Sequence, residues 1–204
     1  MRLATVSRNC LHWARFGARM PKRQAEDTSS RDMASVGSKQ LKSNDEKFTL
    51  FYTPESPFSN FHPAVFELED VKYSCSEQYM MHQKAVLFED TEVGEQIIAA
   101  VKPGKMKQLG RRVKNFDQNV WNENKRAIVK KGVKAKFSQN SDLKKELLKT
   151  QGTTLAEASA NDRIWGIGLG LKNPLALDKK NWKGQNLLGY ILTEVREELI
   201  AEEK

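Results

Sequence analysis

The sequence predicts an α+β domain that is mostly helical, with a short strand and hairpin region at its start. Extended-type segments follow residue 47, helical patterns dominate after them, and 204 residues are enough for one sizeable core but not for two large ones. The composition also changes near residue 47, where a basic stretch poor in apolar residues ends. We therefore expect a single domain over residues 47–202 and an arm over residues 1–46.

The arm has two parts of different composition. Residues 1–24 contain no acidic residue, and a helical wheel separates basic side chains (Arg8, Arg15, Arg19, Lys22) from apolar ones (Leu3, Val6, Cys10, Trp13, Ala14). This pattern is typical of an organellar presequence, and a disordered basic arm is the alternative. Residues 24–47 have too few apolar side chains to build a core, which predicts a disordered linker. We expect the arm to be dispensable for activity, and the protein to be cytoplasmic or mitochondrial.

The expected elements follow from local patterns in chain order. The runs FTLFY, AVFEL and VKYSC predict a first strand and then a hairpin that turns at Glu69 and Asp70. Boundary signals predict a short helical turn after Pro103 and helices over residues 76–88, 92–101, 117–137 and 142–149. Residues 152–170, which include TTLAEAS and several glycines, are expected to be rich in loops. A final helix is indicated by apolar residues at helical spacing, Leu188, Ile191, Leu192, Val195 and Leu199.

Cysteine and histidine usage argues against disulfides and structural zinc. Cys10 and Cys75 lie in different regions, and the three histidines (His12, His62, His82) have no ligand spacing beside them. No apolar run approaches the roughly 20 residues that span a bilayer. We expect a soluble monomer in a reducing compartment, with no metal, cofactor or membrane contact.

The positive charge is concentrated in one part of the predicted domain. The chain carries 34 basic and 26 acidic residues, a net charge of +8, and residues 102–136 hold twelve of the basic residues against Asp117 and Glu123. Such a concentration can attract phosphates or a nucleic acid. The alternative is a solvated helical surface.

The stretch SCSEQYMMHQKA carries two charged residues on an otherwise apolar stripe. At helical spacing Glu77, Met80, Met81 and Lys84 share one face, which suggests the wall of a site. The alternative is a capping box, because Ser74 precedes Glu77 by three residues.

The loop SANDRIWGIGLG offers a second acid. Asp162 and Trp165 stand beside Gly166, Gly168 and Gly170, so a carboxylate, a stacking surface and an approachable backbone occur together. The alternative is a glycine-rich turn in which the aspartate caps the backbone and the tryptophan belongs to the core. No Ser-His-Asp set or Walker loop is recognisable, so enzymatic chemistry would depend on carboxylates, for which we choose Glu77 and Asp162.

Six ordered blocks over residues 48–200 resemble those of the NADAR or YbiA-like family. They are FYTPESPFSNF (51–61), SEQYMMHQKA (76–85), VWNENKRAIVKKGVKAKF (120–137), LLKTQGTTLAEAS (147–159), NDRIWGIGL (161–169) and GQNLLGYILTEVREEL (184–199). The resemblance implies an α+β, mostly helical fold and an N-glycosidase that cleaves a bond between ribose C1 and nitrogen. The substrates it implies are phosphoribosylamino-pyrimidine intermediates of riboflavin synthesis, or ADP-ribose attached to guanine.

The resemblance also implies roles for individual residues. Glu77 matches the acid of the S-E-x-Y block, and Asp162 matches the acid of the N-D-x-x-W-G block. Ile167 stands where some members have an acid, which leaves the substrate preference open. Asn186 and Gly189 match a G-x-N-x-L-G block and are expected to shape the pocket. The substrate-binding residues implied are Phe51, Asn60, Lys84, Trp121, Lys125, Arg126, Trp165, Gly166 and Asn186.

These residues suit cleavage of a C1–N bond. Positive charge develops on the ribose ring as the bond breaks, so we expect Glu77 to stabilise it and to activate water. Asp162 would then serve the ribose hydroxyls or the leaving group. Trp121 and Trp165 would flank the base, and the cations Lys84, Lys125 and Arg126 would hold phosphate. Two alternatives remain: a module that binds ADP-ribose without cleaving it, and a nucleic-acid-binding protein that uses the basic surface.

Overall fold

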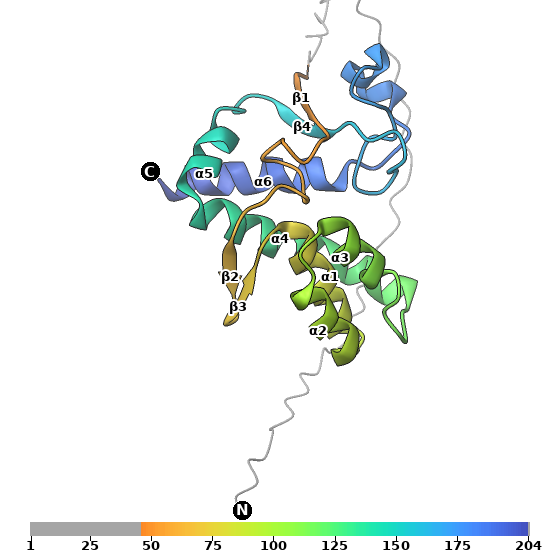
Figure 1. Cartoon of the computed structure of the whole chain (residues 1–204). Helices are drawn as coiled ribbons and strands as arrows, with labels where there is room; N and C mark the ends of the chain where they lie inside the picture. Colours follow the sequence, from red (N-terminus) through yellow and green to blue (C-terminus); the bar gives the residue numbers. More distant parts are fainter. Residues whose placement is uncertain (1–45, 204) are drawn as a thin grey trace, which may run out of the picture. The chain divides into compact units, whose positions relative to one another are not determined.

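Six α-helices and two small sheets form residues 46–203, the part of the chain that the computed structural model describes (Figure 1). The predictions for the presequence and the linker fall on residues outside this range, except at its first two positions. Within it, no helix is long and apolar enough to cross a membrane. The elements are β1 (Phe48–Phe51), β2 (Phe66–Leu68), β3 (Val71–Tyr73), α1 (Ser76–Leu87), α2 (Thr91–Ala99), α3 (Pro103–Gly110), α4 (Gln118–Gln139), α5 (Ser141–Leu148), β4 (Thr154–Glu157) and α6 (Leu187–Glu202), with 3-10 turns at Pro174–Leu177 and Lys179–Asn181.

The predicted hairpin is present, with the predicted turn. Strands β2 and β3 are antiparallel, with Phe66 opposite Tyr73 and Leu68 opposite Val71. Glu69 and Asp70 connect them and both have positive φ, 53° and 62°. A two-residue hairpin loop with this backbone matches the twist of its strands, which is why the turn is so short.

The predicted loop-rich stretch over residues 152–170 also contains a strand that was not predicted, β4. Strand β4 pairs in parallel with β1, from Phe48 opposite Thr154 to Phe51 opposite Glu157. The partner strand is more than 100 residues away in sequence, and a strand of four residues is too short to show an alternating pattern. The missed strand matters because its last residue is an acid.

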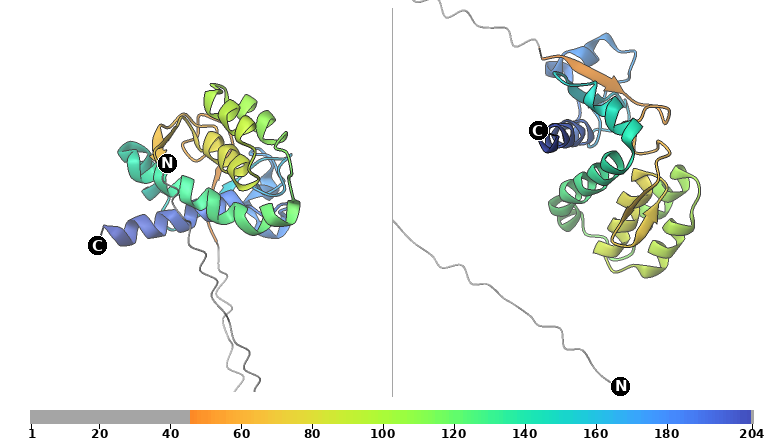
Figure 2. Two further views of the ribbon diagram at one scale, coloured as in Figure 1. Left: turned by 90° about the horizontal axis from the view of Figure 1, so that it is seen from below. Right: turned by 90° about the vertical axis from the view of Figure 1, so that its left-hand side faces the viewer.

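The helices share one hydrophobic core. Helix α1 packs against α2, α3 and α4, while α4 and α6 lie side by side and α6 also supports β4 (Figure 2). The main core cluster draws residues from all of these elements, and it includes all five members of the predicted apolar stripe of α6, Leu188, Ile191, Leu192, Val195 and Leu199.

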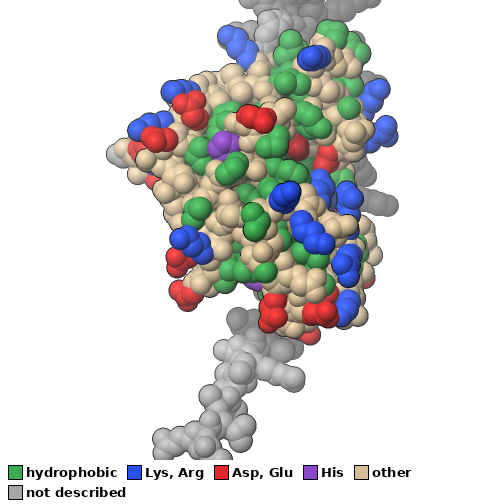
Figure 3. Space-filling model, viewed as in Figure 1, with side chains coloured by type: hydrophobic (Ala, Val, Ile, Leu, Met, Phe, Trp, Pro, Cys, Tyr) green, Lys and Arg blue, Asp and Glu red, His purple; other side chains and the backbone are tan. Residues whose placement is uncertain are grey.

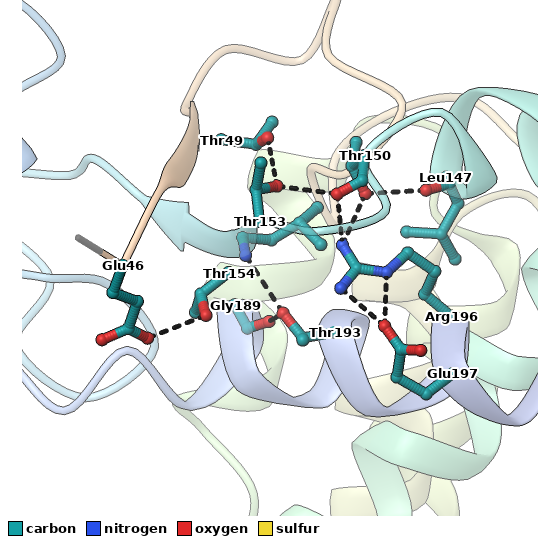
Figure 4. A network of polar contacts seen from close by, with 11 residues as sticks. Glu46, Thr49, Leu147, Thr150, Thr153, Thr154, Gly189, Thr193, Arg196 and Glu197 are labelled. Atoms are coloured by element: carbon teal, nitrogen blue, oxygen red, sulfur yellow. Dashed lines mark hydrogen bonds and ion pairs between the residues drawn. The ribbon is translucent and has the colours of Figure 1, made fainter. Parts of the chain in front are cut away.

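Polar contacts join the β1 and β4 ladder to α6 (Figure 4). Arg196 of α6 is 2% exposed, and its guanidinium donates to the Thr150 carbonyl at 2.7 Å. The hydroxyl of Thr193 accepts the backbone N–H of Leu155 at 3.0 Å, and the Thr49 and Thr153 hydroxyls lie 2.7 Å apart. These bonds hold β4 against the helix, so the residue that ends the strand has a fixed position.

Candidate active site

Glu77 lies buried in the first turn of α1, with 2% of its surface exposed. The N-cap of α1 is Cys75 and no side chain caps the helix. The capping-box alternative is wrong, because the backbone N–H of Ser74 donates to Gln78 Oε1 at 2.7 Å and not to Glu77. The Glu77 backbone N–H donates to the Asn60 carbonyl at 2.9 Å, which ties the start of α1 to the loop before it.

The Glu77 carboxyl group has a buried oxygen that no group in residues 46–203 satisfies. Its Oε1 atom has no hydrogen-bond partner there. Burial raises the pKa of Glu77 to about 7, the positive charge of Lys107 opposes that shift, and the negative charge of Asp162 adds to it. An unpaired buried carboxyl group is costly for folding, so its presence points to a function outside the fold's own stability.

Glu157 is a second acid with a buried carboxyl oxygen, and sequence reasoning did not single it out. It is the last residue of β4, and its Oε2 atom is buried with no hydrogen-bond partner in the described chain. Burial raises the pKa of Glu157 to about 7, the charge of Asp162 raises it further, Lys107 opposes the rise, and Glu77 adds to it. The sequence did hold one signal, since Glu157 stands between Ala156 and Ala158 in an otherwise apolar segment, and both alanines are fully buried.

Asp162 faces the same group of charges but is held by its own loop. Its Oδ1 accepts the backbone N–H groups of Ile164 at 2.9 Å and Trp165 at 2.8 Å, and Trp165 packs against the main core. One oxygen of Asp162 therefore caps the backbone, as the alternative predicted. The negative charge of Asp162 also raises the pKa of both Glu77 and Glu157.

Gly166 and Asn186 set the distance between the loop that holds Asp162 and the end of β4. A Cβ on Gly166 would lie 2.7 Å from the Glu157 carbonyl, so only glycine permits the approach. Asn186 is fully buried, and it accepts the Glu157 N–H at 3.0 Å and donates to the Leu155 carbonyl at 2.9 Å. Both residues therefore position Glu157.

The cations that act on Glu77 come from α3 and its C-terminal end. Lys107 and Arg111 both lower the pKa of Glu77 against the effect of burial. Lys107 is half-buried, and its ammonium lies 5.7 Å from the centre of the Phe61 ring. Figure 3 shows basic side chains gathered on the face over α3. Within the basic stretch these two residues were not predicted individually.

The cations predicted from the sequence have other neighbours. The Lys84 ammonium donates to the Gly110 carbonyl at 2.9 Å and lies 3.9 Å from the centre of the Phe116 ring, so it ties α1 to the end of α3. Lys125 and Arg126 line a pocket of about 570 Å³ whose lining includes none of the three acids. Arg126 also pairs with Glu194 of α6.

The remaining predicted residues belong largely to the core or to backbone contacts. Trp121 is 8% exposed, and Phe51 is 3% exposed and packs edge-on against Phe58 at 5.7 Å between ring centres. Asn60 contributes its carbonyl to the Glu77 N–H. The charges of Asp162 and the unpredicted Lys107 therefore act on both Glu77 and the unpredicted Glu157, and Arg111 acts on Glu77.

Comparison with known proteins identifies the family to which this chain belongs. The NADAR domain family model matches residues 43–200. The protein is 44% identical to N-glycosidase R617 of Acanthamoeba polyphaga mimivirus over 146 residues, which cover 69% of this chain and 86% of that one. It is 40% identical to protein irg-1 of Caenorhabditis elegans over 168 residues, covering 74% and 79% of the two chains.

A solved structure gives the same fold. The NMR structure of the Escherichia coli protein YbiA matches with a TM-score of 0.64 and 31% sequence identity, over 78% of this chain and 88% of YbiA. A mostly helical fold with a small sheet is therefore the fold of this part of the chain.

Proposed function

This chain belongs to the NADAR domain family and is a hydrolase of N-glycosyl compounds, and we propose that it cleaves the ribose C1–N bond of an anionic ribosyl substrate. The observation that carries the proposal is a pair of carboxyl groups, on Glu77 and Glu157, each with a buried oxygen left unpaired by residues 46–203. The nearby positive charge of Lys107 suits a substrate that carries phosphate.

Glu77 has the environment that the central step needs. When the C1–N bond breaks, its electron pair leaves with the nitrogen and the ribose ring becomes positively charged. An ionised carboxylate in a site of low dielectric stabilises that charge strongly, and it also accepts a proton from the water that attacks C1. A carboxyl group whose pKa is raised to about 7 by burial is still ionised in much of the population near neutral pH.

The substrates that we propose are ADP-ribosylated guanine, as a nucleotide or within a nucleic acid, and phosphoribosylamino-pyrimidines. Both place phosphate beyond the ribose, where Lys107 and Arg111 would bind it. Trp165 is partly exposed and follows Asp162 by three residues, so it offers a surface on which the base can stack.

A product analysis with both substrates tests this function. The purified protein is incubated with an ADP-ribosylated guanine oligonucleotide and, separately, with a phosphoribosylamino-pyrimidine, and free base and reducing sugar are measured. We expect base release from at least one of them and none from a Glu77→Gln control. Tight binding of ADP-ribose without any base release would instead indicate a binding module.

A further inference from the structure

We propose that Glu157, and not Asp162, is the second catalytic carboxyl group, and that it gives its proton to the nitrogen that leaves the ribose. This inference rests on the proposed function and assigns a residue to one of its steps.

The backbone of Glu157 is fixed while its side chain is unpaired. Its N–H is held by Asn186, and its carbonyl accepts the N–H groups of Ile167 and Ser159, both at 2.9 Å. The side-chain Oε2 is buried with no partner in residues 46–203. A carboxyl group presented in this way is preorganised for a ligand, because its backbone needs no rearrangement and no protein bond has to break.

Asp162 differs from Glu157 on both points. One of its oxygens already accepts two backbone N–H bonds that shape the loop before Trp165. These bonds already commit that oxygen to the loop, which suits a residue that positions others. Its negative charge raises the pKa of Glu157, so Asp162 acts on the reaction through that neighbour.

The charges around Glu157 suit a proton donor near neutral pH. Burial and the charges of Asp162 and Glu77 raise the pKa of Glu157, while Lys107 opposes them, and the result is about 7. The negative charge of Glu77 raises the pKa of Glu157, so an ionised Glu77 favours a protonated Glu157, and such a pair gives the division of labour that glycoside hydrolysis requires. The Glu157 proton moves to the leaving nitrogen, water adds to C1, and the water's proton passes to Glu77.

The test compares Glu157→Gln with Asp162→Asn on whichever of the two substrates releases base. The pH dependence of kcat/KM is measured with each full-length variant. We expect Glu157→Gln to lower the rate about 100- to 1000-fold and to abolish the alkaline limb of the profile, since the group whose proton is needed is gone. Asp162→Asn should keep that limb but move it to lower pH, because removal of a negative charge lowers the pKa of Glu157.

Several outcomes would overturn the assignment. A Glu157→Gln protein within a few-fold of wild type would remove Glu157 from the chemistry, and loss of the alkaline limb in Asp162→Asn alone would assign the proton to Asp162. If Glu157→Gln does not fold, Glu157→Asp serves instead, with a reduced rate and a retained alkaline limb expected; a wild-type rate would contradict the proposal. Base release by the wild type separates these outcomes from failure of the proposed function, in which no substrate is cleaved.

Discussion

The basic residues of α3 and α4 follow one another in the sequence, but they differ in their ion-pair partners. On α4 three cations face a row of acids on α6 and pair with them: Arg126 with Glu194, Lys130 with Glu194 and Glu198, and Lys134 with Glu198 and Glu202. On α3 and the residues that flank it, five cations form no ion pair within residues 46–203: Lys102, Lys105, Lys107, Arg111 and Arg112.

Helix packing explains the difference. The cations of α4 and the acids of α6 both recur every four residues, and the two helices lie side by side, so one row matches the other. Helix α3 has only eight residues, and two of these cations, Lys107 and Arg111, act instead on the buried Glu77. A run of charged residues therefore indicates a functional site only where those residues have no ion-pair partners.

The largest expected effect separates these two surfaces directly. Lys107→Gln with Arg111→Gln should lower kcat/KM about 1000-fold, because hydrogen bonds to charged groups are worth roughly 1.5 to 3 kcal/mol each. The matched variant, Arg126→Gln with Lys130→Gln, removes the same charge and should stay within about threefold of wild type. Steady-state kinetics on the cleaved substrate make the comparison, and equal losses in both variants would mean that only net charge matters.

The second effect is a difference in pH dependence between the buried and exposed acids. The folded-state pKa of Glu77 is raised from 4.5 to about 7 by burial, so its contribution to stability is complete below pH 4.5 and is lost as pH rises through about 7. The pKa of the α6 residue Glu198 is lowered by its bonds to Lys130 and Lys134, so its contribution is present above pH 4.5 and is lost as pH falls.

Urea unfolding at several pH values measures this difference. The wild type should lose on the order of 3 kcal/mol of unfolding free energy between pH 4.5 and 7, and Glu77→Gln should not show this loss. Glu198→Gln should leave that range unchanged and affect only the acid side. If the unfolding free energy of Glu77→Gln depended on pH as that of the wild type does, burial would not raise the pKa of Glu77.

The smallest effect concerns the opposite side of α4. Lys136 is 1% exposed, and its ammonium donates to the carbonyls of Pro57 at 2.7 Å and Ser59 at 3.0 Å. Lys136→Met leaves both carbonyls without this donor and should cost about 2 kcal/mol of unfolding free energy. The exposed neighbour Lys134, changed to Met, should cost under about 1 kcal/mol. Chemical denaturation gives both values, and equal costs would refute a role for Lys136 in holding this loop.

Local patterns were sufficient for much of the fold and for one acid of the site. The hairpin turn at Glu69 and Asp70 and the apolar stripe of α6 depend on neighbours in sequence, so they were predictable. Glu77 was predictable because a charge on an apolar helical stripe is visible without a structure.

The features that were missed depend on pairings distant in sequence. Strand β4 becomes a strand only by pairing with β1, and that pairing places Glu157, with its buried Oε2, at the end of the strand. Lys107 differs from Lys130 only in what packs beside it, and no sequence window holds that information. The composition of the glycine-rich loop and the resemblance to a family both pointed to Asp162 and Trp165, but neither pointed to the cations that act on Glu77.

The central claim is that Glu77 is kept buried and unpaired for catalysis and not for folding. The most direct measurement compares turnover, ADP-ribose binding and melting temperature of Glu77→Gln with those of wild type at pH 7.5. We predict turnover at or near background, retained binding, and a melting temperature no lower than that of wild type. A variant that turns over within a few-fold of wild type would contradict the claim, because the carboxylate would then be a structural feature of the start of α1.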